Sequence, residues 1–201
     1  MVQKTSFVSD GYRLEGVLER TDGERGVVIA HPHPLYGGNM HNSVVGTLSR
    51  VYHEKGFTTL RFNFRGVGAS QGQYDHGNGE ITDALAAVNH LKEIGLVDIE
   101  VAGYSFGAYI WGRAAMERGC TASMVMISPP LAFMDFSGIQ PCADLRLIIV
   151  GQEDEIAPLV AVREWISTAR HRIRMETVPR ADHFFSGRLA ALEAALRGCL
   201  S

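Results

Sequence analysis

A serine flanked at close range by two glycines stands at the end of an apolar stretch, in the order Gly103-Tyr104-Ser105-Phe106-Gly107. Residues 99–103 have the composition of a buried strand, and residues 108–118 have that of a helix. Gly-x-Ser-x-Gly between a strand and a helix is typical of a sharp turn that presents a serine hydroxyl as a nucleophile. The alternative is a glycine-rich turn in which the serine only caps a helix. We interpret Ser105 as a nucleophile.

The spacing of this motif has a physical reason. A serine hydroxyl is a weak nucleophile until a base removes its proton, so it must be presented to that base. The strained turn that projects Ser105 brings the residues two before and two after it together, and both must therefore be small. The N-terminus of the following helix offers free N–H groups and a positive dipole to a developing oxyanion. The motif therefore requires a base and a second oxyanion donor elsewhere in the chain.

The base must come from the eight histidines of the chain. His183 follows the last predicted strand, residues 174–178, and precedes the last predicted helix. Because the carboxyl ends of parallel strands gather at one edge of a sheet, this position brings His183 near the end of strand 99–103. Three other histidines lie on helical stretches or helix ends and are expected at the solvated surface: His53, His90 and His171. We therefore assign His183 as the general base.

A catalytic histidine needs a third group that holds its tautomer and stabilises the imidazolium. The strand that ends near Val150 runs into a segment with three carboxylates, Glu153, Asp154 and Glu155. Asp182 is a weaker candidate, because neighbours in the chain rarely fold back to bond each other's rings. Two further carboxylates remain as alternatives: Asp135 and Asp144.

An unusual loop follows the predicted strand 27–30, with the sequence His-Pro-His-Pro-Leu-Tyr-Gly-Gly-Asn over residues 31–39. Acyl transfer needs two backbone N–H donors aimed at the oxyanion. One is expected from Phe106 and the other from this loop. Proline has no N–H, which leaves the amides of His33, Leu35 and Tyr36. We favour His33 as the donor, and we expect the substrate to contact Leu35, Tyr36 and Tyr104.

The sequence has two further segments that resemble ligand sites, one for a metal and one for a nucleotide. His31, His33 and His41 have the side chains that ligate zinc, but no carboxylate lies close to them in sequence, and the serine site needs no metal. The loop 63–70 is glycine-rich but lacks the lysine and hydroxyl pattern of a nucleotide-binding loop. We therefore expect neither a metal nor a cofactor, and we expect Arg65 to bond backbone carbonyls or a carboxylate.

The elements that carry these loops alternate along the whole chain, which predicts one α/β domain over residues 1–201 with a mostly parallel sheet and helices on both faces. A hairpin over residues 5–8 and 12–19 comes first. Short apolar runs then mark the buried strands: 27–30, 58–62, 99–103, 124–127, 147–150 and 174–178. Helical periodicity covers residues 44–52, 81–91 and 189–196, and Gly56 and Gly95 are placed to end two helices.

Composition limits the classes of partner. Hydrophobic residues make up 46% of the chain, and the formal net charge is −3. This balance gives no reason to expect nucleic acid or a membrane, and it leaves a small-molecule substrate as the expected partner. Met1 to Asp10 lack the pattern of a signal peptide, and the three cysteines have no metal-ligand spacing. We expect reduced thiols and a cytoplasmic protein, either a monomer or a homodimer.

Four motifs in order resemble a known group: residues 31–38, 61–70, 103–107 and 182–185. Together the motifs resemble those of the small bacterial α/β-hydrolases related to dienelactone hydrolase and to the esterase and acyl-peptidase-like branch. The resemblance covers nearly the whole chain. It implies an eight-stranded, mostly parallel sheet and a catalytic triad carried here by Ser105, Asp154 and His183, and it favours Asp154 over the other carboxylates.

One departure from many α/β-hydrolases concerns the lid. Only residues 128–144 separate two predicted strands, which leaves no room for a helical lid domain, so we expect an open, shallow site. The sequence thus predicts a serine hydrolase of the carboxylesterase type that cleaves small acyl esters through an acyl-enzyme. The alternatives are a thioesterase or peptidase with the same triad, and a binding protein that retains the fold without catalysis.

Overall fold

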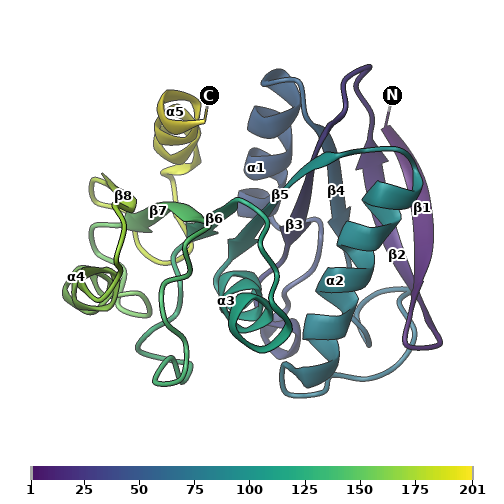
Figure 1. Cartoon of the computed structure of the whole chain (residues 1–201). Helices are drawn as coiled ribbons and strands as arrows, with labels where there is room; N and C mark the ends of the chain where they lie inside the picture. Colours follow the sequence, from purple (N-terminus) through teal and green to yellow (C-terminus); the bar gives the residue numbers. More distant parts are fainter. Residues whose placement is uncertain (1, 201) are drawn as a thin grey trace.

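The structure is a computed structural model, and it describes residues 2–200. Within these residues, eight strands form one sheet in the order β1-β2-β4-β3-β5-β6-β7-β8 (Figure 1). The strand β2 is antiparallel to both of its neighbours, and the six strands from β4 to β8 in this order are parallel. The predicted, mostly parallel sheet is thus confirmed. The strands are β1 Val2–Ser9, β2 Tyr12–Glu19, β3 Arg25–Ala30, β4 Thr58–Phe62, β5 Asp98–Tyr104, β6 Met124–Ile127, β7 Leu145–Gly151 and β8 Arg174–Val178.

The central strands are continuous apolar runs because both of their faces are covered. In β3, Val28 belongs to the apolar core on one face of the sheet, while Val27 and Ile29 belong to the core on the other face. All four residues of β6 are buried. The outer strand β1 instead shows buried and exposed residues in turn near its end, where Phe7 is buried and Val8 is exposed. This is the pattern of a strand with one face exposed to solvent.

Five α-helices cover the two faces of the sheet within the described chain. Figure 1 shows α1 and α5 on one side and α2, α3 and α4 on the other. Leu48 of α1 and Leu192 of α5 pack in one core, and Leu91 of α2 and Trp111 of α3 pack in the other. Within residues 2–200, no helix is long and apolar enough to cross a membrane. The helices are α1 Ser43–Glu54, α2 Asn78–Glu93, α3 Phe106–Arg118, α4 Leu159–Ser167 and α5 Leu189–Cys199, with a short 3₁₀ helix, η1, over Pro34–Tyr36.

Three histidines expected at the solvated surface lie at the surface but are partly buried: His53, His90 and His171. The outer hairpin accounts for His90, because the Phe7 ring of β1 stacks on the imidazole with ring centroids 5.4 Å apart. The Thr5 hydroxyl also lies 3.1 Å from His90 Nε2. Periodicity within α2 places His90 on a polar stripe but carries no information about the strand that folds over it.

Arg65 has the structural role expected of it. Its guanidinium is buried and makes two hydrogen bonds to the carboxylate of Asp83 on α2, from Nε at 3.0 Å and from Nη2 at 2.8 Å. The Arg65 amide donates to the same carboxylate, as does the hydroxyl of Ser9. The glycine-rich loop after β4 is therefore fixed to α2 and β1 by a buried ion pair with two guanidinium–carboxylate hydrogen bonds.

The connection between β6 and β7 is short and contains neither a helix nor a strand. It covers residues 128–144, as expected from the sequence, and no lid domain is inserted there. The carboxyl ends of β3, β5, β7 and β8 consequently lie open to one another at one edge of the sheet.

Candidate active site

Ser105 lies in the turn between β5 and α3, in a backbone conformation that serine rarely adopts. Its φ is 54° and its ψ is −117°. This region is populated mainly by glycine, and a non-glycine residue held there stores strain. The surrounding hydrogen bonds hold it in place, because the Ser105 amide donates to Ile127 O of β6 at 2.9 Å and the carbonyl accepts from Ala108 and Tyr109.

The two flanking glycines are required by close approach. A Cβ built on Gly103 would lie 2.4 Å from the carbonyl carbon of Gly107, and one built on Gly107 would lie 2.3 Å from the carbonyl oxygen of Ala30. Both distances are far shorter than real carbon contacts. The expected closeness of the residues on either side of Ser105 is thus seen directly, and it also brings α3 against β3.

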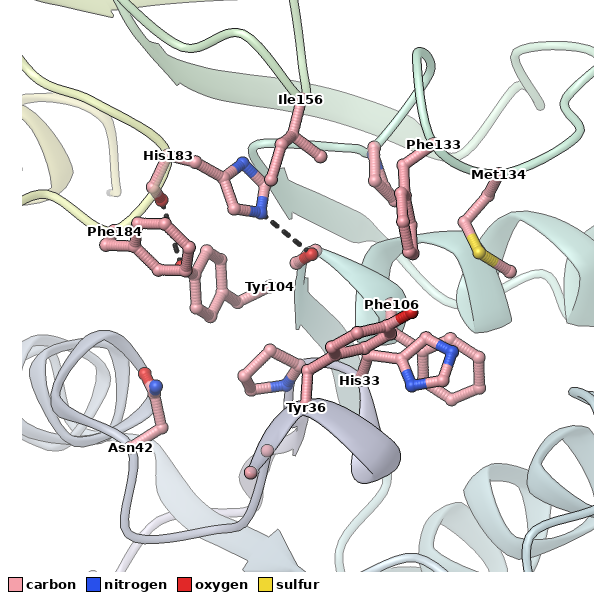
Figure 2. A pocket seen from close by; sticks show the side chains of 15 residues that line it. His33, Tyr36, Asn42, Tyr104, Phe106, Phe133, Met134, Ile156, His183 and Phe184 are labelled. Carbon is pink, nitrogen blue, oxygen red and sulfur yellow. Dashed lines mark hydrogen bonds between the residues drawn. The ribbon is translucent and has the colours of Figure 1, made fainter.

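The structure brings the three sequence-predicted site residues together in one hydrogen-bonded chain. The Ser105 hydroxyl oxygen lies 2.9 Å from His183 Nε2 (Figure 2). His183 Nδ1 lies 2.9 Å and 3.0 Å from the two carboxylate oxygens of Asp154. An ionised carboxylate only accepts hydrogen bonds, so Nδ1 carries the proton and donates. Nε2 is then left as an acceptor for the Ser105 proton.

Asp154 is held as a carboxylate. Burial acts to raise its pKa, but the hydrogen bond and the charge of His183, together with the bond from the Ala157 amide, outweigh burial and place the pKa below its ordinary value. The Ile156 and Ala157 amides donate to Oδ1 at 3.0 Å and 2.7 Å. The carboxyl group is therefore ionised where it meets His183, as a group that orients an imidazole must be.

The competing carboxylates are placed elsewhere. Glu153 and Glu155 are exposed on either side of the buried Asp154. Asp182 accepts from the Ser186 amide at 2.8 Å and caps the turn after His183. Asp135 accepts from the Ser137 amide in the β6–β7 connection. Of these carboxylates, Asp154 is the one in contact with the His183 ring.

Tyr104 holds the backbone of His183 in place through a hydrogen bond. Its hydroxyl donates to the backbone carbonyl of His183 at 2.9 Å, and burial raises the pKa of this hydroxyl far above its ordinary value. The side chain is almost wholly buried. The bond joins the residue before Ser105 to the loop that carries the base, so the distance between the serine and the histidine is fixed by the fold.

The loop after β3 is anchored by His31. This imidazole is fully buried, its Nδ1 lies 2.6 Å from Pro32 O, and its Nε2 accepts from the Phe64 amide at 3.1 Å. The two bonds require the neutral tautomer with the proton on Nδ1. Burial lowers the pKa of His31 to about 4. His31 is therefore occupied by bonds that tie the loop after β3 to the loop after β4.

Three loop amides were considered as oxyanion donors, and two of them have partners in the loop. The Leu35 amide donates to His33 Nδ1 at 3.3 Å, and the Tyr36 amide donates to His33 O at 3.1 Å. Neither the His33 amide nor the Phe106 amide has a hydrogen-bond partner among residues 2–200. Phe106 is the first residue of α3, where helical amides are free by geometry. These two unshared donors are the ones favoured from the sequence.

A cavity of about 310 Å³ opens above Ser105. Its volume lies near the lower end of the range for small-molecule pockets, roughly 300–1,000 Å³. Within the described chain, none of its lining side chains is an aspartate, glutamate, lysine or arginine. The lining residues are Pro32, His33, Tyr36, Gly37, Gly38, Asn42, Tyr104, Ser105, Phe106, Pro130, Phe133, Met134, Ile156, His183 and Phe184.

The expected substrate contacts are placed unevenly. Tyr36 and Tyr104 line the cavity, whereas Leu35 does not and has a side chain that is 67% exposed. The reason is the 3₁₀ geometry of η1, in which successive residues point about 120° apart. The sequence reasoning also missed several lining residues. Phe133 and Met134 lie in the β6–β7 connection, and their only signal is that two apolar residues occur in a short loop.

The buried His31 leads to a pH-dependent stability. Below its ordinary pKa of 6.5 the unfolded histidine binds a proton that the folded one excludes until about pH 4. The free energy of unfolding is therefore expected to fall as the pH decreases from 6.5 to 4, and to level off below that. At 1.36 kcal/mol per unit, the loss from this residue is on the order of 3 kcal/mol. Urea unfolding at a series of pH values measures it.

The matched variant is His31→Gln. Its amide oxygen can accept from the Phe64 amide as Nε2 does, but it does not titrate. We expect this variant to be less stable than the original protein at pH 7.5 and to show a clearly shallower loss between pH 6.5 and pH 4. An unchanged slope in the variant would show that His31 does not cause the pH dependence.

The strand order, the strained serine between β5 and α3, and the order of serine, aspartate and histidine along the chain define an α/β-hydrolase. A Coxiella burnetii α/β serine hydrolase homologue has a TM-score of 0.91 and 35% identity, covering 99% of this chain and 97% of its own. A lidless α/β serine hydrolase of Xanthomonas campestris has a TM-score of 0.90 and 33% identity, covering 99% and 93%.

A Rickettsia prowazekii protein described as uncharacterised is 35% identical over 185 residues, which is 86% of this chain and 78% of that protein. No protein-family model matches the chain. At the identity and coverage of the Coxiella burnetii and Xanthomonas campestris structures, the chain belongs to the lidless bacterial α/β serine hydrolases.

Proposed function

We propose that the protein is a carboxylesterase-type serine hydrolase that cleaves small acyl esters through an acyl-enzyme, with Ser105, His183 and Asp154 as its catalytic triad. The observation that carries the proposal is the continuous chain of hydrogen bonds from Ser105 Oγ through His183 to an ionised Asp154, at the floor of a cavity. A strained serine bonded to an oriented histidine has no use in a protein that only binds its ligand.

The first half of the reaction forms the acyl-enzyme. Ser105 Oγ attacks the ester carbonyl carbon as its proton passes to His183 Nε2, and the carbonyl π electrons move to the oxygen. The tetrahedral intermediate then collapses, the bond to the alcohol oxygen breaks, and His183 returns the proton to that oxygen. Asp154 stabilises the imidazolium throughout without taking a proton itself.

The second half releases the acid. A water molecule takes the place of the alcohol, His183 removes one of its protons, and the resulting hydroxide attacks the acyl carbon. Collapse of the second intermediate breaks the bond to Ser105 Oγ, which recovers its proton from His183. In both halves we assign the amides of Phe106 and His33 as the oxyanion donors, because they are the unshared N–H groups beside the serine.

The direct test is reaction with a fluorophosphonate probe, with the adduct located by mass spectrometry. We expect labelling at Ser105 that is lost in His183→Ala. If the folded protein does not react, the serine is not activated and the proposed function is wrong. Ester, thioester and amide substrates with the same acyl group then establish which bond is preferred, and we expect the ester to react faster than the amide because an alkoxide is the better leaving group.

The open cavity predicts a preference for short acyl chains. A space of about 310 Å³ without a covering lid buries a short acyl group but leaves the remainder of a long one in water, so added methylenes gain little binding energy. In a series of p-nitrophenyl esters with straight-chain acyl groups, kcat/KM is expected to be highest for about two to six carbons and to fall as further methylenes are added. A rise that continues to acyl groups of about twelve carbons would contradict the expectation.

A further inference from the structure

The cavity has two unlike sides. Relative to the dashed hydrogen bond between the His183 ring and the serine hydroxyl, Figure 2 shows Phe133, Met134 and Phe106 on one side, and Phe184 and Asn42 on the other. We call the side chains of His33, Tyr36, Phe106 and Phe133 the aromatic wall. Both sides belong to one continuous cavity.

Three rings of the aromatic wall, those of His33, Tyr36 and Phe133, pack edge to face, and the rings of Tyr36 and Phe133 remain exposed. The Tyr36 and Phe133 rings have centroids 5.6 Å apart at an interplanar angle of 76°, and His33 lies 5.0 Å from Tyr36 at 74°. Tyr36 is 73% exposed and Phe133 is 52% exposed, although both line the cavity. An aromatic ring of a substrate would extend this edge-to-face arrangement and bury apolar area that is now exposed to solvent.

The wall contains no charged group. Its two titratable side chains are those of His33 and Tyr36. Burial lowers the His33 pKa, which favours the neutral ring. Its Nδ1 accepts from the Leu35 amide and its Nε2 lies 3.2 Å from the Tyr74 hydroxyl. The imidazole is therefore already bonded on both nitrogens. A carboxylate placed against the wall would lose part of its hydration and gain no cation, which is unfavourable.

The geometry of the reaction decides which part of the ester meets this wall. The leaving oxygen must lie near His183 Nε2 to receive its proton, and the alcohol is then directed to the Phe184 side. The oxyanion faces the Phe106 and His33 amides. The acyl group takes the remaining direction, away from His183 and between Phe133 and Tyr36.

We infer that the acyl groups this enzyme selects are uncharged and carry an aromatic ring, and that acyl groups bearing a carboxylate are rejected. The inference rests on the proposed function, since it names the substrate class of the same site. It also explains why these aromatic side chains are present, because Tyr36 and Phe133 are largely exposed to solvent and therefore stabilise the fold little.

The test compares three methyl esters with one leaving group: methyl 3-phenylpropanoate, methyl 3-cyclohexylpropanoate and methyl 3-(4-carboxyphenyl)propanoate. We expect kcat/KM for the phenyl ester to exceed that for the cyclohexyl ester by about three- to tenfold, the size of a ring–ring preference. We expect the carboxylated ester to react at least about tenfold more slowly than the phenyl ester. Equal rates for the phenyl and cyclohexyl esters would overturn the aromatic preference.

Substitutions in the wall locate the effect. Phe133→Leu is expected to reduce the phenyl-to-cyclohexyl ratio to about one to twofold, because it removes a ring but keeps an apolar side chain. The matched control is Phe184→Leu, which removes a ring that is also mostly exposed from the other side of the cavity and is expected to leave the ratio unchanged. If Phe184→Leu changes the ratio and Phe133→Leu does not, the acyl group lies on the opposite side.

A gain of function tests the charge rule. Phe133→Arg removes a ring and adds a cation at the same wall, so it is expected to lower the rate for the phenyl ester and to raise the rate for the carboxylated ester by about tenfold or more. No gain with the carboxylated ester would show that the rejection does not come from the missing cation.

Failure of this inference is distinguishable from failure of the proposed function. If the fluorophosphonate labels Ser105 and the methyl esters react without aromatic preference, only the inference is wrong. If no ester reacts, binding of the three esters to Ser105→Ala, measured by ligand-observed NMR, still tests the inference. Tighter binding of the phenyl ester would support it, and equal binding of all three would overturn it.

Discussion

Replacing Ser105 with alanine is expected to lower kcat for ester hydrolysis by about 10⁴-fold or more while leaving the fold intact. The substitution removes the atom that forms the acyl-enzyme, and in hydrolases with a triad the loss of the nucleophile costs about as much as the loss of all three members. Among residues 2–200 the Ser105 Oγ makes one hydrogen bond, to His183 Nε2, so little structure depends on it. Steady-state kinetics and a thermal unfolding midpoint measure the two parts of the prediction.

A second substitution at the same position separates chemistry from backbone strain. Ser105→Gly also removes the nucleophile, but glycine adopts a φ of 54° without the steric cost of a Cβ. We expect this variant to be as inactive as Ser105→Ala and more stable than the original protein, by about 1–2 kcal/mol. Substantial turnover in either variant would refute the assignment of Ser105, and a loss of stability in Ser105→Gly would show that the turn is not strained.

Replacing Asp154 with asparagine is expected to lower kcat by about 10³- to 10⁴-fold. An asparagine amide can donate to His183 Nδ1, which favours the tautomer with the proton on Nε2. That proton then points at Ser105 and prevents the histidine from acting as a base. The amides of Ile156 and Ala157 keep their acceptor if the carbonyl oxygen takes the place of Oδ1. The expected loss is therefore catalytic more than structural.

Asp182→Asn is the matched control, because Asp182 is the neighbour of His183 in the chain. Its carboxylate caps the Ser186 amide and does not touch the imidazole, and asparagine can cap the same amide. Activity is expected to stay within about threefold of the original protein. If Asp182→Asn were inactive and Asp154→Asn active, the histidine would be oriented by a different carboxylate in solution.

The strand positions and the nucleophile turn could be predicted because each depends on local sequence. Buried strands are continuous apolar runs, and the turn around Ser105 needs small residues at Gly103 and Gly107 for contacts that arise within five residues. The helix α4 was not anticipated, since Leu159–Ser167 is short and follows Pro158 without a capping side chain. A helix of this length depends on packing more than on its own sequence.

Side chains that meet across the fold were harder to predict. Asp154 and Asp182 have the same side chain. Which of them faces His183 depends on the pairing of β7 with β8. Phe133 reaches the cavity from a loop without periodicity, so no pattern marks it, and Phe184 stands out only as part of the motif 182–185. Leu35 was expected in the site because it belongs to the same loop as His33, but the turn of η1 directs it to solvent.

The aromatic wall draws its parts from three places in the chain: the loop after β3, the start of α3 and the β6–β7 connection. Tyr36 and His33 lie in a loop that His31 bonds to its neighbour, whereas Phe133 and Met134 lie in the connection 128–144, which carries none of the three triad residues. Of the four wall residues, Phe133 is thus the one whose segment supplies neither a triad residue nor an oxyanion donor. Exchanging residues 129–134 for those of a relative would change this part of the wall and leave the triad and both oxyanion donors in place, so acyl preference can vary here without loss of turnover.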